Sequence, residues 1–165
     1  MSISERERRV LDFLEALGIG YTRIEHPAVY TVDQARAHRS DQPGAHCKNL
    51  FLRNKKGRRH FLVILEESKT ADLRVLARHL GEDRLSFASP ERLLRHLDLE
   101  PGAVSPFGLI NDTRREVHVL IDQDLRGAGY IFFHPNVNTA TIGLSFTDFE
   151  RFLDHCGQTL NYLRF

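Results

Sequence analysis

The polar residues that could do chemistry in this sequence stand at the ends of apolar segments. Lys48 and Asn49 open an apolar strand, and His134 follows the apolar run Tyr130–Phe133. Because lysine prefers solvent, the simplest interpretation of Lys48 is a solvated strand end. Binding and catalytic residues also collect where elements end. The functional interpretation is therefore a fixed cation at the mouth of a pocket.

A second candidate is a loop of small residues. It consists of Gly102, Ala103, Val104, Ser105 and Pro106. Such a segment can be an ordinary surface loop. It can also be a rigid stretch whose backbone N–H groups converge on an anion or on a developing oxyanion.

Metal and nucleophile chemistry find little support in the spacing of the nine histidines and two cysteines. In His46-Cys47 and His155-Cys156 the side chains are sequence neighbours, which point in different directions on a strand or a helix. The sequence contains no zinc-ligand spacing, no nucleophile elbow and no glycine-rich nucleotide loop. We therefore expect no metal and no cofactor, and we expect Cys47 to be a core or pocket-wall residue.

One predicted turn is strongly basic. Its five cations are Arg53, Lys55, Lys56, Arg58 and Arg59. Hairpin tips are often basic for solubility alone, but such a cluster can also contact phosphate. The chain has 23 Lys+Arg against 22 Asp+Glu, and this balance argues against a broadly basic nucleic-acid coat. It does not exclude RNA, because acids such as Glu66 and Glu82 offset the local run.

Capping residues and helical apolar spacing predict five helices that would position these groups. They begin at Ser4, Thr31, Thr70, Ser89 and Thr147. The first runs to residue 17, and Gly18 and Gly81 stand where a left-handed residue ends a helix.

Apolar segments bounded by turn residues predict seven strands. They span residues 21–26, 47–53, 60–65, 84–88, 117–122, 130–133 and 139–144. The almost continuous apolar run 60–65 is typical of a central strand buried on both faces. Residues 40–45 and 98–107 are predicted loops, and 54–57 is a hairpin turn.

Length and composition fit one ordinary domain. Residues 1–165 are 41% hydrophobic and 27% charged, and the interleaved strands and helices with hairpin links predict a single α+β domain with a mixed sheet. No apolar run reaches the roughly 18–20 residues of a membrane span. The charged N-terminus is unlike a signal peptide, and two cysteines make no disulfide framework. We expect a cytoplasmic protein without membrane or DNA partners.

Four motifs together resemble a known family. They are His26-Pro27 with Thr31, the run Cys47–Leu52, the run Gly102–Leu109, and Phe133-His134-Pro135 with 138–141. This order and spacing are similar to those of the bacterial YbaK-like editing domains that hydrolyse mischarged prolyl-tRNA, whether free-standing or inserted in prolyl-tRNA synthetase. Among free-standing members the chain looks most like the alanyl-tRNA(Pro) deacylases, and unlike the cysteinyl-tRNA(Pro) branch.

The resemblance implies a fold and a mechanism. The fold would be a curved mixed sheet flanked by helices. Lys48 would hold the terminal adenosine and the ester, and the backbone of Gly102–Pro106 would bind the carbonyl. Water would attack without a protein nucleophile, assisted by a ribose hydroxyl. The implied substrate pocket consists of Val29, Thr31, Cys47, Asn49 and His134.

The implied partner is mischarged proline tRNA, held in part by the five cations of the 53–59 run, and an association with prolyl-tRNA synthetase stays open. Three alternatives remain. The first is an editor of another small residue such as serine, because an added hydroxyl is hard to exclude sterically. The second is a catalytically silent RNA-binding or regulatory module. The third is a small-molecule-binding domain without RNA.

Overall fold

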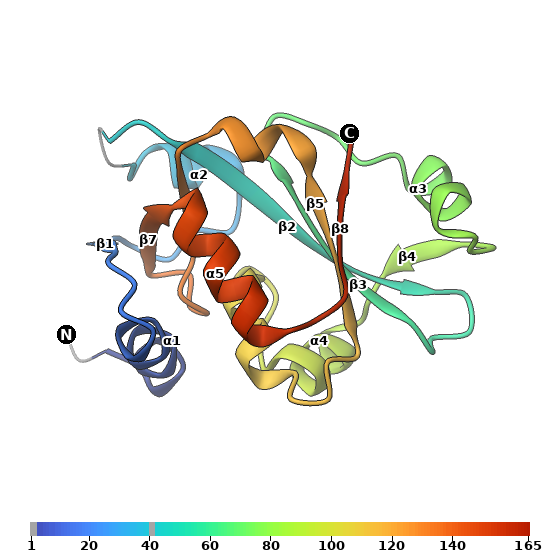
Figure 1. The fold of residues 1–165 in the computed structure, drawn as a ribbon, viewed down its shortest axis with the longest axis horizontal. Helices are drawn as coiled ribbons and strands as arrows, with labels where there is room; N and C mark the ends of the chain where they lie inside the picture. The colour runs from blue at the N-terminus through green and yellow to red at the C-terminus, as the bar shows by residue number, and fades with distance from the viewer. Residues whose placement is uncertain (1–2, 40–41) are drawn as a thin grey trace.

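The computed structural model describes residues 3–39 and 42–165, and their strands form one mixed eight-stranded sheet (Figure 1). The strand order is β1-β7-β6-β2-β3-β5-β8, with β4 paired to β2. The strands are β1 Thr22–Glu25, β2 Ala45–Asn54, β3 His60–Glu66, β4 Leu85–Phe87, β5 Val117–Asp122, β6 Tyr130–Phe133, β7 Ala140–Ser145 and β8 Leu160–Leu163. The mixed α/β prediction is confirmed.

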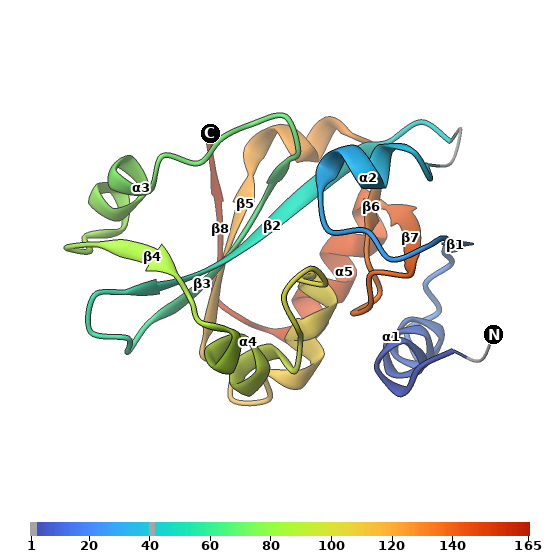
Figure 2. The same ribbon diagram turned by 180° about the vertical axis from the view of Figure 1, so that it is seen from behind.

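Five α-helices and two short 3-10 helices accompany the sheet in the described residues. The α-helices are α1 Glu5–Ala16, α2 Val32–Arg36, α3 Leu73–Leu80, α4 Pro90–Leu97 and α5 Phe146–Cys156. The 3-10 helices are η1 Pro106–Asn111 and η2 Gln123–Gly127. Helix α3 lies at the end of the molecule remote from α1, as both ribbon views show (Figures 1 and 2). None of these helices is long and apolar enough to span a membrane.

The long strand β2 joins the two parts of the sheet. Its first residues, Ala45 and His46, pair in parallel with β6. Its middle pairs antiparallel with β3, and its last residues pair with β4. Lys48 therefore lies close to the junction between the two parts, where the pairing partner of β2 changes.

Strand β3 is buried on both faces, as its apolar run predicts. Leu62 and Ile64 belong to the larger core, which also contains residues of α1, α4 and α5. Phe61, Val63 and Leu65 belong to a second core, to which α3 contributes. Alternate residues of a strand point to opposite faces, so this one strand needs apolar side chains at every position.

Three of the five predicted helix caps are confirmed: Ser4, Thr31 and Ser89. The other two were wrong. The Asp72 carboxylate, not Thr70, caps α3 by accepting hydrogen bonds from the amides of the next turn. The Ser145 hydroxyl, not Thr147, caps α5. In both cases a competent oxygen acceptor lies two residues from the predicted one, and spacing alone does not choose between them.

Three elements were missed. The loop prediction for 98–107 did not anticipate η1, which begins at Pro106, and η2 and β8 were also left out. Strand β8 pairs in parallel with β5. It has only four residues, which is too short a segment for a clear pattern of apolar residues. Of the loop predicted for 40–45, residues 40 and 41 lie outside the described residues, and Ala45 belongs to β2.

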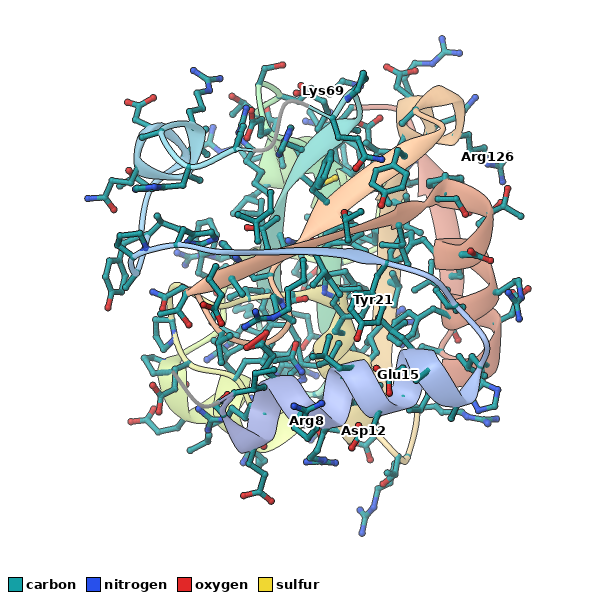
Figure 3. All side chains as sticks on the ribbon, turned by 90° about the vertical axis from the view of Figure 1, so that its left-hand side faces the viewer. Arg8, Asp12, Glu15, Tyr21, Lys69 and Arg126 are labelled. Atoms are coloured by element: carbon teal, nitrogen blue, oxygen red, sulfur yellow. The ribbon has the colours of Figure 1, made fainter. Side chains whose placement is uncertain are left out.

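Two side-chain contacts fasten α1 to β1 and to the residue just before it; the second joins Tyr21 to Glu15, which are labelled in Figure 3. The Arg23 guanidinium on β1 binds both oxygens of the buried Glu7 carboxylate, at 2.8 and 3.0 Å. After the helix, the Tyr21 hydroxyl donates to Glu15 at 2.9 Å. The Glu7 carboxylate, three residues after the N-cap Ser4, therefore binds Arg23 on the sheet rather than the amide of Ser4.

Candidate active site

A small pocket between α2, the start of β2 and the 102–104 loop gathers eight of the eleven residues predicted to be catalytic or to bind the substrate. Its volume is about 220 Å³. It is lined by Val29, Tyr30, Thr31, Val32, Ala35, Cys47, Lys48, Asn49, Glu67, Gly102, Val104 and His134. Sites for drug-sized ligands are roughly 300–1,000 Å³, so this pocket suits a small group.

The chain that forms one wall of the pocket is fastened to the segment before β7. The amides of His26 and Val29 donate to the carbonyls of Thr139 and Asn138, and the Asn138 side chain donates back to Val29 O at 3.1 Å. The Thr141 hydroxyl lies 2.8 Å from Nε2 of His26. These contacts fix where α2 begins and so fix that wall of the pocket.

Lys48 contributes an uncompensated positive charge. It lines the pocket and forms no ion pair with any described residue. The one acid in the lining, Glu67, is already engaged: it pairs with Arg36 at 3.6 Å and with Arg39, while its amide donates to His46 O. The Glu67 carboxylate thus holds α2 against the sheet and leaves the Lys48 ammonium available.

Gly102 faces Lys48's strand across the pocket in a conformation that suits glycine. Its φ is +88°, and an added Cβ would lie 2.9 Å from Cδ1 of Tyr30. The amides of Gly102 and Val104 donate to no acceptor among the described residues. The Asn49 side chain donates to Val104 O at 3.4 Å, which joins the loop to β2. Two free backbone donors therefore lie near the cation.

The rest of the predicted loop does not line the pocket. The Ala103 amide donates to the Glu100 carbonyl oxygen at 3.1 Å within a turn, and Pro106 has no N–H. Ser105 is fully buried, and its hydroxyl caps η1 by accepting from Phe107 N. The loop therefore contributes only two residues to the pocket lining, Gly102 and Val104. The remaining three hold the loop in shape. Of the predicted set of converging backbone amides, only the amides of Gly102 and Val104 remain candidates.

His134 presents a neutral imidazole to the pocket. Its Nδ1 lies 2.8 Å from Ala140 O, and since a carbonyl only accepts, Nδ1 carries the proton. Burial lowers the pKa of His134, although this hydrogen bond opposes the shift, and the neighbouring His26 lowers it further. Nε2 has no partner among the described residues and remains a hydrogen-bond acceptor.

No side chain of the pocket is set up as a nucleophile. Burial raises the pKa of the Cys47 thiol well above its usual value, and nearby carboxylates, Glu66 first, raise it further. The Thr31 hydroxyl is occupied as the cap of α2. No three His, Cys, Asp or Glu side chains of the described residues gather closely enough to hold a metal ion.

The predicted RNA-binding residues lie elsewhere, at the β2–β3 turn. Lys48 and Arg53 are five residues apart on β2, about 16 Å at 3.3 Å per residue. The turn is also less positive than its sequence suggests. Arg59 pairs with Glu82, and the Arg53 guanidinium donates to backbone carbonyls of the turn. Glu82 is 23 residues from Arg59 in the sequence, yet its carboxylate lies against this turn.

Three cations of this turn remain free. Lys55, Lys56 and Arg58 are exposed, and their side chains form no ion pair with a described residue. They can therefore meet a phosphate group without first breaking a contact within the protein.

Four lining residues escaped sequence reasoning: Tyr30, Val32, Ala35 and Glu67. Tyr30 is 70% exposed and adjoins the recognised Thr31, so an exposed aromatic beside a motif was an available signal. Glu67 reaches the pocket only because the β2–β3 hairpin returns it beside His46. Nothing in its sequence neighbourhood indicates that placement.

Comparisons with known proteins converge on one family. Residues 26–152 match the aminoacyl-tRNA editing domain family. The chain is 41% identical over 155 residues to the prolyl-tRNA editing protein ProX of Acetoanaerobium sticklandii, covering 94% of each chain. It is 40% identical to the prolyl-tRNA synthetase associated domain-containing protein 1 of Danio rerio, covering 93% of this chain and 84% of the relative.

A solved structure supports the same fold. A crystal structure described as a candidate trans-editing enzyme for prolyl tRNA synthetase superposes with a TM-score of 0.74 at 24% identity, covering 99% of both chains. The motif residues build the pocket, and the sequence matches the family over most of the length of the chain. This chain therefore belongs to the aminoacyl-tRNA editing domain family.

Proposed function

We propose that residues 1–165 form one trans-editing domain that hydrolyses alanine from mischarged alanyl-tRNA(Pro). Membership of the aminoacyl-tRNA editing family makes the chain a deacylase that acts on tRNA. The observation that carries the finer proposal is the unpaired Lys48 ammonium, which shares a pocket of about 220 Å³ with the free amides of the Gly102 loop. A cation and free N–H donors in a small pocket suit the oxygen atoms of a small acyl ester.

The proposed chemistry needs no protein nucleophile, because an aminoacyl ester is already activated. Lys48 would hold the terminal ribose and the ester oxygen. The oxygen of a water molecule attacks the carbonyl carbon, and the Gly102 and Val104 amides stabilise the negative charge that develops on the carbonyl oxygen. The bond to the ribose oxygen then breaks, and that oxygen leaves as a hydroxyl after taking the proton that the attacking water gives up. Positioning supplies much of the acceleration.

Two side chains fit the amino group of the substrate. The Oδ1 atom of Asn49 lies in the pocket wall and accepts no hydrogen bond from any described residue, while its amide nitrogen donates to Val104 O. Nε2 of His134 is the second free acceptor. An α-ammonium donates up to three hydrogen bonds, so these acceptors would orient the aminoacyl group.

Pocket size would supply the selectivity against proline. Val29, Thr31 and Cys47 restrict the pocket, and Val29 is buried and held by two backbone contacts. Binding preference alone separates homologues by about 10–200-fold per methylene, so rejection of the larger proline ring by steric overlap is the more effective route.

The proposed function is tested by deacylation of alanyl-tRNA(Pro) and seryl-tRNA(Pro) by the wild-type protein. We expect rapid release of alanine. Preferential release of serine would keep the chemistry and replace the substrate. Tight tRNA binding without hydrolysis of either ester would identify a silent module instead.

Replacing Cys47 by alanine should leave deacylation within about twofold of the wild-type rate, because the raised pKa of the thiol removes it as a nucleophile. The measurement is single-turnover release of labelled alanine. Cys156→Ala serves as a matched control, since burial also raises the pKa of that thiol, to about 12. A folded but inactive Cys47→Ala would restore the thiol mechanism.

Reversing the three free turn cations, Lys55, Lys56 and Arg58, to glutamate should weaken tRNA binding and flatten its salt dependence. Each lost phosphate contact lowers the slope of log affinity against log salt by about 0.7–0.9. Titrations at several salt concentrations measure this. The melting temperature should not fall, because these side chains form no ion pair with a described residue. An unchanged slope would place the RNA on another surface.

The proposed substrate also suggests where the protein works and with what. Its partner would be mischarged proline tRNA in the cytoplasm, where aminoacyl-tRNA is made and used. We further propose a transient association with prolyl-tRNA synthetase, which would let the editor meet its substrate before the ribosome does.

A further inference from the structure

A second hollow, of about 740 Å³, lies at the far end of the β2–β3 hairpin from the pocket. Its walls come from three places in the sequence: the hairpin turn, the C-terminal end of α4 and the loop that precedes β5. In the view from behind, the end of α4 and the hairpin turn border the lower edge of the molecule, while α2 lies at the upper edge (Figure 2).

Four guanidinium groups border this hollow. They belong to Arg58, Arg95, Arg114 and Arg115. All four residues are exposed, and none of them forms an ion pair with a described residue. Unpaired guanidinium groups around a concave surface can bind an anion, because arginine binds phosphate oxygens in a bidentate manner.

The two acids in the wall offset only part of this charge, and the oxygens of one of them are not available to pair with the arginines. Both carboxylate oxygens of the buried Asp112 accept hydrogen bonds from the amides of Glu116 and Val117, and Gln158 donates to it as well. Asp112 is therefore turned into the protein as a structural acceptor. Glu116 is exposed and is the one acid left to oppose four arginines in the described wall.

The floor of the hollow holds polar atoms without partners. The rings of His60 and His96 lie 4.0 Å apart. Nε2 of His60 faces the Arg92 guanidinium at 3.1 Å and must accept from it, so His60 is neutral, and burial lowers its pKa to about 4. Nε2 of His96 is buried and has no hydrogen-bond partner among the residues that the structure describes. The floor of the hollow is therefore formed by imidazole rings and carries no carboxylate of a described residue that would repel an anion.

We propose that this hollow binds a backbone phosphate of the tRNA acceptor stem, with Arg95 and Arg114 as its principal contacts. The inference rests on the proposed function for its choice of RNA. Two observations favour RNA over a small phosphorylated compound. The arginines stand exposed on an open rim, and the hollow continues into the free cations of the hairpin through Gly57 and Arg58.

The separation of the two sites also fits. His60 pairs with Arg53, and Lys48 pairs with Leu65, so five residues of strand, about 16 Å, separate the hollow from the pocket. A tRNA ends in an unpaired 3′ strand that precedes the duplex of the acceptor stem. With its aminoacyl end in the pocket, the first duplex phosphates would come within reach of the hollow.

The test compares two substrates with the double variant Arg95→Glu/Arg114→Glu. One substrate is alanyl-tRNA(Pro), and the other is the alanyl ester of the terminal CCA trinucleotide, which has no stem. We expect the KM for the tRNA to rise by about tenfold with kcat within about twofold, and the salt slope to fall by about one to two. Cleavage of the trinucleotide ester should not change, and it also reports that the variant is folded.

The matched control is Arg8→Glu/Arg74→Glu, two exposed arginines on α1 and α3, away from the hollow (Arg8 is labelled in Figure 3). It makes the same charge change and should leave the KM for the tRNA within about twofold. An equal rise in KM for both double variants would reduce the effect to general charge and overturn the proposal. An unchanged KM in Arg95→Glu/Arg114→Glu would overturn it directly.

Two further arms separate the remaining outcomes. If the wild-type protein hydrolyses neither ester, the proposed function fails, and the hollow is then judged by the affinity of uncharged tRNA(Pro) for the two double variants.

Inorganic phosphate is titrated while the ring signals of His96 are followed by NMR. A phosphate-dependent shift combined with unchanged tRNA affinity in Arg95→Glu/Arg114→Glu would assign the hollow to a small phosphorylated ligand and overturn the RNA assignment.

Discussion

Replacing Lys48 by alanine should slow the hydrolysis of alanyl-tRNA(Pro) by about 100-fold or more. The Lys48 ammonium is the one cation in the described lining of the pocket, and no carboxylate neutralises it. Removing a single group that stabilises transition-state charge typically costs about 10²–10³ in rate. Single-turnover release of labelled alanine, with enzyme in excess, measures the chemical step without the contribution of tRNA binding.

Lys48→Met provides the matched control for this result. Methionine keeps much of the apolar stem, so a loss of activity equal to that of Lys48→Ala would assign the effect to the charge. Lys48→Arg should recover part of the rate if a cation is what the site needs. A methionine variant close to wild type would show that Lys48 acts through packing and would remove it from the proposed mechanism.

Gly102→Ala should lower kcat/KM by about tenfold or more and reduce the free energy of unfolding by about 1 kcal/mol. Two effects act together. The backbone has φ +88°, which a residue with a Cβ adopts only under strain, and the new Cβ would meet the Tyr30 ring at 2.9 and 3.2 Å. Both effects would shift the Gly102 amide that we propose binds the carbonyl oxygen. Chemical denaturation and steady-state kinetics measure the two losses.

The double variant Tyr30→Ala/Gly102→Ala separates these effects, because it removes the contact and keeps the backbone strain. We expect it to recover little activity if the strain dominates. Gly127→Ala is the glycine control, since a Cβ there meets nothing within 4 Å. Normal activity in Gly102→Ala would mean that the loop amides do not take part in the reaction.

The sequence predicted the parts of this site that are carried by local pattern. Lys48 and Gly102 were found because each stands at the end of an element in a motif of fixed spacing, and the strands behind them follow from apolar periodicity. The sequence could not show which backbone amides of the Gly102 loop are free and which donate to an acceptor within the protein. Whether the Ala103 amide turns inward to Glu100 depends on backbone geometry that residue types alone do not set.

The rest depended on contacts between distant residues. The turn at 53–59 reads as five cations in sequence, yet Glu82, 23 residues away from Arg59, neutralises part of that charge. Glu67 likewise enters the pocket through the return of β3 beside β2. The hollow beside α4 collects arginines from three separate segments. Local pattern identifies such residues as charged but does not bring them together.

The release of alanine and of proline from the same tRNA(Pro), measured side by side with the wild-type protein, tests the size-selecting pocket most directly. Our proposal requires that the wall at Val29, which backbone hydrogen bonds hold in place, leaves room for the alanyl methyl group and overlaps the proline ring. We predict rapid alanine release with a rate for proline at least about 100-fold lower. Equal release of the two amino acids, or faster release of proline, would contradict a size-selecting editing pocket.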